Sequence, residues 1–87
     1  MNKPIRNAIA QGYPMQWEMD PSSVAGCMRL VTITYTYENG NVRTRTLERT
    51  YSPVAACRLS REITAAGGKL EGPSPDDLHT RWLEVQP

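Results

Sequence analysis

The stretch of sequence that decides the fold is residues 31–51, VTITYTYENGNVRTRTLERTY. Apolar and aromatic residues alternate with threonines up to Asn39-Gly40, and a second run of strand-forming residues follows. Alternation with a period of two is typical of a half-buried strand. Asn-Gly favours a two-residue turn because both residues tolerate positive φ. The stretch therefore predicts two antiparallel strands joined at Asn39-Gly40.

A two-residue turn also predicts the register of this hairpin. Ile33 is expected opposite Thr46, so that the aromatic and aliphatic residues share one face of the sheet. Glu48 would then lie opposite Val31 on this apolar face, and a β-bulge would relieve that conflict. The other face carries threonines alternating with three arginines, which are Arg43, Arg45 and Arg49.

Two shorter elements are predicted before the hairpin. Pro4 and Gly12 bracket a short helix, since proline suits the first helical turn and glycine suits the position just past a helix end. Apolar and polar residues alternate over residues 15–19, which predicts a third strand. Pro14 indicates that this strand lies at an edge of the sheet.

Two helices are predicted after the hairpin. Ser52-Pro53 is a helix start, with serine as the N-cap and proline in the first turn, and the helix should run to Ala66. Residues 69–72 form either a fourth strand or a simple connection. Ser74-Pro75 begins the second helix, although a strand over residues 80–85 is the alternative.

Together these elements predict one α+β domain over residues 1–87, a three-stranded antiparallel meander covered on one face by helices. A chain of 87 residues forms a single small core, which excludes a two-domain enzyme. No apolar run reaches the roughly 18 residues of a membrane span. The start of the chain lacks the apolar segment of a secretory signal. We therefore expect a cytoplasmic protein that does not contact membranes.

The sequence predicts no enzymatic activity, metal or cofactor. Cys27 and Cys57 are too few for a disulfide-rich scaffold, and reduced thiols are expected in the cytoplasm. With His79 they supply only three widely spaced zinc ligands. Phosphate-binding loops, nucleophile elbows and metalloprotease motifs are absent. An arrangement of Cys57 with His79 and Asp76 is the enzymatic alternative, but His79 is expected to face solvent from its helix.

Charge is divided unevenly along the chain. The net charge is +1, yet residues 29–61 carry +4 through six arginines and two glutamates, and residues 62–87 carry −3. The planar guanidinium of arginine suits carboxylate and phosphate groups. Arg43, Arg45 and Arg49 are therefore the candidate binding residues, although a solvated sheet face is a second explanation. Trp17 is the candidate apolar anchor, and core packing is its alternative role.

Two resemblances bear on function. The order of one helix, three strands and one helix over residues 4–66 resembles the double-stranded RNA-binding domain. The lysine-rich start of that family's second helix is replaced here by SPVAACR at residues 52–58, so its phosphate-binding residues cannot be transferred. The hairpin around YTYENGNVR at residues 35–43, packed on a helix in so short a chain, resembles small phage-encoded inhibitors, of which anti-CRISPR proteins are the best-known group.

The second resemblance implies a non-enzymatic protein that occupies a surface of a bacterial defence complex. We expect the partner to be a protein or nucleoprotein complex that contacts Arg43, Arg45, Arg49 and Trp17. Direct binding of DNA or RNA by the arginine face is the alternative, because arginine and threonine both donate to phosphate oxygens. The sequence leaves open whether an unpaired strand edge joins two copies into a homodimer.

Overall fold

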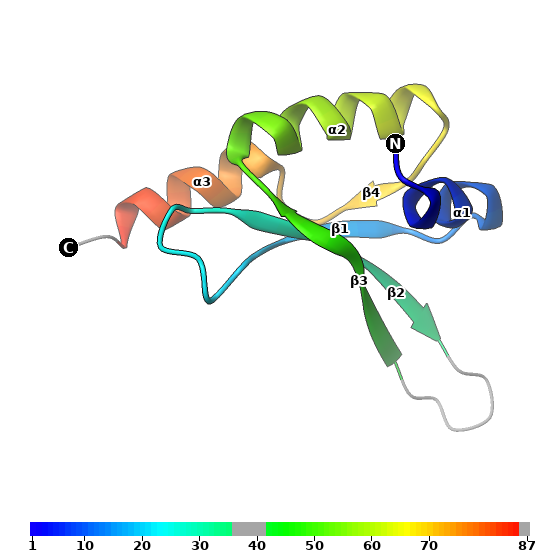
Figure 1. Ribbon diagram of the computed structural model, residues 1–87, viewed down its shortest axis with the longest axis horizontal. Helices are drawn as coiled ribbons and strands as arrows, with labels where there is room; N and C mark the ends of the chain where they lie inside the picture. Colours follow the sequence, from blue (N-terminus) through cyan, green and yellow to red (C-terminus); the bar gives the residue numbers. More distant parts are fainter. Residues whose placement is uncertain (36–41, 86–87) are drawn as a thin grey trace.

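The computed structural model describes the backbone of residues 1–35 and 42–85 and the side chains of residues 1–32 and 50–85. It confirms an α+β architecture in which helices pack on a sheet (Figure 1). The predicted turn at Asn39-Gly40 lies outside the described residues. The elements in chain order are α1 (Lys3–Gln11), β1 (Met15–Met19), β2 (Met28–Tyr35), β3 (Val42–Tyr51), α2 (Pro53–Ala65), β4 (Leu70–Glu71) and α3 (Pro75–Glu84).

The sheet has four strands in the order β3-β2-β1-β4, which corrects the prediction of three antiparallel strands. β4 pairs in parallel with the start of β1, and the Met15 amide donates to the Lys69 carbonyl at 2.8 Å. β1 is therefore an inner strand, and the edge position inferred from Pro14 was wrong. Pro14 precedes the first residue of β1, so its missing N–H costs the strand ladder nothing.

The register between β2 and β3 differs from the prediction toward the hairpin tip. Ile33 lies opposite Thr44 instead of Thr46, whereas Arg29 lies opposite Thr50 as a two-residue turn predicts. The register shifts between Arg29 and Val31. Between these two residues β2 has only Leu30, whereas β3 has the three residues 47–49. Val31 consequently lies opposite Thr46, and the shift removes Glu48 from the position that had conflicted with it.

The helices cover the sheet face that the sequence had assigned to threonine and arginine, which corrects the predicted phase of β2. Met28 and Leu30 are fully buried, and they lie opposite Met19 and Trp17 of β1. Val31 and the residues in phase with it belong to the opposite face. The start of β2 determines which of its residues face the helices, because Met28 and Leu30 are the large apolar residues that meet the apolar side of β1.

The core is completed by α1 and α2. α1 contributes Ile5 and Ala8, and its N-cap Asn2 accepts a hydrogen bond from the Ile5 amide at 3.0 Å. α2 begins at the predicted Ser52 cap, whose hydroxyl accepts from the Ala55 amide at 3.2 Å. From α2 the buried residues are Ala56, Leu59 and Ile63.

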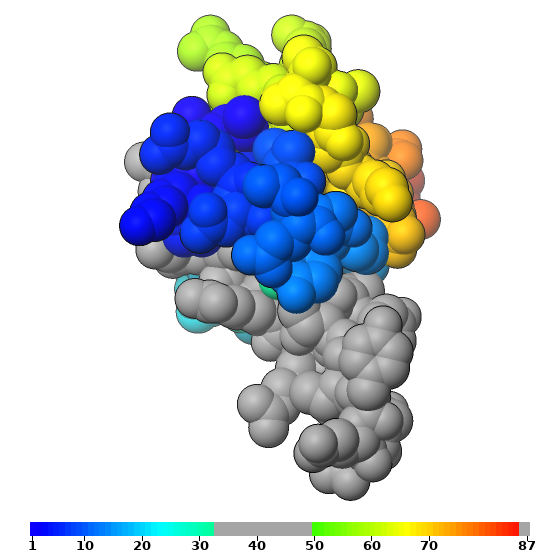
Figure 2. Space-filling model, turned by 90° about the vertical axis from the view of Figure 1, so that its right-hand side faces the viewer, coloured from blue at the N-terminus to red at the C-terminus, as the bar shows by residue number. Residues whose placement is uncertain are grey.

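A tight connection returns the chain from α2 to the sheet. Gly67 has a φ of 84°, and Gly68 packs so closely that a Cβ atom there would lie 2.5 Å from Cγ2 of Ile63 and 3.1 Å from Cγ1 of Ile9. Figure 2 shows this segment, in yellow, beside the N-terminal residues, in blue. The glycine thus lets α2, α1 and the start of β4 approach one another.

The last element is the helix predicted from Ser74-Pro75, so the alternative of a strand over residues 80–85 was wrong. The Ser74 hydroxyl accepts from the Asp77 amide at 3.1 Å. Leu78 packs against the core, and Trp82 lies over Gly26, where a Cβ atom would come within 3.1 Å of the indole. Among the described residues, no helix has the length and apolar character needed to cross a membrane.

Candidate binding surfaces

β3 carries the three predicted binding arginines at one end of the sheet order. Arg43 and Arg45 lie opposite Thr34 and Thr32 in the register, and Arg49 falls within the shifted segment near the base of the strand. The side chains of residues 42–49 lie outside the described part of the structure. The structure thus gives the strand and the backbone positions of the three arginines. That their side chains share one face stays a prediction.

One end of the β2–β3 pair extends past the helices. Thr32 lies opposite both Met15 and Arg45, so position 45 belongs to the helix-covered side of the sheet. Figure 1 shows β2 and β3 continuing beyond α1 and α2 at the end where Tyr35 pairs with Val42. Arg43 follows Val42 at this end of β3, whereas Arg45 pairs with Thr32, which is buried.

Trp17 belongs to the core and does not provide the exposed anchor that we expected. Its side chain is 2% exposed, and Nε1 donates to the Ser60 hydroxyl at 2.8 Å. That hydroxyl in turn donates to the Ala56 carbonyl at 2.9 Å. The Trp17 ring also meets Tyr51 edge to face, with centroids 5.6 Å apart. The alternation over residues 15–19 was equally compatible with a core residue and with an exposed anchor. The hydrogen bond to Ser60 could not be predicted, because Ser60 is distant in sequence.

Cys57, Asp76 and His79 do not form the arrangement of a nucleophile with a base. The Cys57 thiol donates to Asp76 at 3.3 Å, and partial burial together with this carboxylate raises the pKa of the thiol. A cysteine nucleophile needs the opposite shift. His79 stacks on Trp82, and its Nδ1 is buried with no hydrogen-bond partner in the described part of the chain. The expectation that His79 faces solvent was therefore wrong in part.

The cysteines and acidic residues show no sign of a metal centre in the residues that the structure describes. Cys27 and Cys57 are both unpaired and partly buried. Among the side chains of residues 1–32 and 50–85, no three His, Cys, Asp or Glu groups gather closely enough to hold an ion. An ion pair joins Arg29 to Glu18 at 3.4 Å across β2 and β1 on the sheet face away from the helices, and it is partly exposed.

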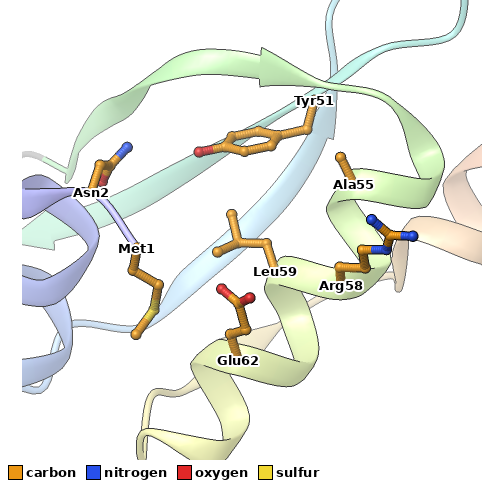
Figure 3. Close-up of a pocket in the computed structure, with 7 residues that line it drawn as sticks. All are labelled: Met1, Asn2, Tyr51, Ala55, Arg58, Leu59 and Glu62. Carbon is orange, nitrogen blue, oxygen red and sulfur yellow. The ribbon is translucent and has the colours of Figure 1, made fainter.

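A surface pocket of about 290 Å³ lies between the start of α1 and the side of α2 (Figure 3). Tyr51 and Leu59 form its apolar floor, and each is 7% exposed. The pocket could not be predicted from the sequence, because it joins the first two residues of the chain to the end of β3 and to α2, about fifty residues later. The lining residues are Met1, Asn2, Tyr51, Ala55, Arg58, Leu59 and Glu62.

Comparison with known proteins gives no relative from which a function can be transferred. The sequence matches no family model, no curated protein and no solved structure. We therefore infer function from the chain's own residues and geometry.

Proposed function

We propose that this protein is a non-enzymatic binding protein that occupies a surface of a larger protein or nucleoprotein complex. The observation that carries the proposal is the concentration of Arg43, Arg45 and Arg49 on one strand at the end of the sheet order. With Glu48 as the only acidic residue of β3, the strand has a net charge of +2 on a chain whose total is +1. The positive charge is thus concentrated on this one strand.

The chemistry of these arginines defines the partner surface. A guanidinium group forms paired hydrogen bonds with a carboxylate or a phosphate, so an acidic protein surface and a nucleic-acid backbone both complement β3. A strand at the end of a sheet also offers backbone groups to an extended partner segment. Surfaces that combine acidic side chains with bound nucleic acid are found on nucleoprotein complexes, which is why we favour them as targets.

We further propose that the target is a bacterial defence complex and that binding blocks it. This part rests on the resemblance to small phage-encoded inhibitors of the anti-CRISPR kind. Such an inhibitor acts in the cytoplasm of the bacterial cell, where its target lies. Blocking requires only that a surface of this protein binds the target with sufficient affinity, so no catalytic residues are needed.

The test is to capture tagged protein from a bacterial lysate, with and without nuclease treatment, and to identify the material retained. A defined protein or nucleoprotein complex that survives nuclease supports the proposal and identifies the target. Recovery of nucleic acid alone, lost after nuclease, overturns it in favour of direct DNA or RNA binding.

Direct nucleic-acid binding is the second candidate, favoured by the register that places Arg43 and Arg45 opposite Thr34 and Thr32 of β2. Salt separates the two candidates. If three phosphates are neutralised, the affinity for a DNA duplex should fall by about 40-fold between about 50 and 200 mM salt. A weaker dependence with retained binding favours the protein partner.

A further inference from the structure

The pocket between α1 and α2 combines an apolar floor with one inward-facing carboxylate. Figure 3 shows the Glu62 carboxylate directed toward Leu59 and the space in front of Met1. The Tyr51 ring lies on the other side of Leu59. An occupant would therefore meet the small exposed parts of an aliphatic and an aromatic side chain on the floor and a negative charge at one wall.

The lining also carries two cations, which are the N-terminal ammonium of Met1 and the guanidinium of Arg58, and the Arg58 side chain is directed elsewhere. Arg58 lies one helical turn before Glu62 on α2, but Figure 3 shows its guanidinium extending away from Glu62 toward α3. In the described part of the chain Glu62 forms no ion pair. The carboxylate is thus available to a cation from outside, and an anionic occupant would face it directly.

We propose that this pocket receives the side chain of a lysine residue presented by a partner polypeptide. The ammonium group pairs with Glu62, while the four-carbon stem lies along Leu59 and the Tyr51 ring. A volume of about 290 Å³ is at the lower end for small-molecule sites, which suits one long side chain better than a cofactor.

This inference goes beyond the proposed function and does not depend on the arginines of β3. Tyr51 is the last residue of β3, so the pocket adjoins that strand and a single partner can reach both. The pocket also supplies the anchoring point that the buried Trp17 does not provide. Here the partner inserts a side chain, and this protein receives it.

The test is a titration of the isotope-labelled full chain with Nα-acetyl-lysine N-methylamide, followed by amide chemical shifts. We expect saturable shifts confined to residues 51–62 and the start of α1. The norleucine analogue, which has a similar stem and no charge, should bind about fivefold more weakly or less. Equal binding of the two probes, shifts elsewhere, or no saturable shift overturns the proposal.

Variants assign the effect to the carboxylate. Glu62→Gln keeps the size of an exposed helix residue and should weaken binding of the lysine probe by about fivefold. Glu84→Gln, an exposed acid on α3, is the matched control and should leave binding unchanged. The variant Arg43→Ala/Arg45→Ala/Arg49→Ala should also bind the lysine probe normally, which keeps this test separate from the proposed function. An unchanged affinity in Glu62→Gln contradicts the inference.

Discussion

The hydrogen bond between Trp17 and Ser60 should contribute measurably to stability. Trp17→Phe removes the indole donor and part of a ring that is 2% exposed, and we expect a loss of about 2–3 kcal/mol in the free energy of unfolding. Ser60→Ala leaves the indole N–H buried without its acceptor, which costs about 1–3 kcal/mol. In the double variant the hydrogen bond is lost only once, so the two losses should fall short of additivity by about 1 kcal/mol.

Urea unfolding followed by circular dichroism measures this coupling without relying on tryptophan fluorescence. Thr64→Ala, on the exposed side of α2, is the control and should be additive with Trp17→Phe. Because Trp17 is a core residue, binding of a captured partner by folded Trp17→Phe should equal that of the parent chain. Additivity of Trp17→Phe with Ser60→Ala within about 0.3 kcal/mol would refute the energetic role assigned to the hydrogen bond.

Three further perturbations follow from local geometry. Gly68→Ala should lower the free energy of unfolding by about 1–3 kcal/mol, since its Cβ would meet Ile63 at 2.5 Å, and an unchanged thermal midpoint would contradict this. Ser52→Ala should cost about 1 kcal/mol through loss of the α2 cap, measured by urea unfolding, whereas no change would show that the cap contributes nothing. Burial and Asp76 raise the pKa of the Cys57 thiol, so its alkylation by iodoacetamide should rise at higher pH than that of free cysteine, and Asp76→Asn should shift the profile to lower pH. The stabilisation linked to this thiol is present below its unfolded pKa and is lost as pH rises through its folded pKa. An alkylation profile of Cys57 at lower pH than that of free cysteine would contradict the raised pKa.

Local signals predicted most of the elements. Ser52 and Ser74 cap helices because their hydroxyls accept from amides three residues later, and each is followed by proline. The alternation over residues 15–19 likewise produced a strand at Met15–Met19. These signals suffice because the hydrogen bonds and φ angles that decide a helix start or a strand lie within a few residues.

Features that depend on distant residues were predicted less well. β4 has two residues and exists because the Met15 amide meets the Lys69 carbonyl, a pairing between segments more than fifty residues apart. The covered face of the sheet was assigned from residues 31–37, whereas Met28 and Leu30 determine it by meeting β1. A shift by one residue exchanges the two faces, so the strand was predictable and its phase was not.

Part of the candidate site could likewise be predicted from local sequence, and part depends on tertiary contacts. The identity and strand of Arg43, Arg45 and Arg49 follow from the sequence, because charge and alternation can be counted along the chain. Trp17 was misassigned, since one strand pattern serves both a core and an interface. The pocket at Glu62 depends on α1 meeting α2, which only the tertiary structure brings about.

The most direct measurement is the affinity of the purified chain for the complex that it captures, compared between two triple variants of equal charge change. Arg43→Ala/Arg45→Ala/Arg49→Ala removes the β3 arginines, and Arg6→Ala/Arg61→Ala/Arg81→Ala removes three exposed helix arginines. With about 1.5 kcal/mol for each charged contact, the β3 variant should bind roughly a thousandfold more weakly. The helix variant should stay within about threefold of the parent chain if its arginines make no contact and act only by screened charge. Parent-like affinity in the β3 variant, or equal losses in both, would contradict the claim that β3 is the binding strand.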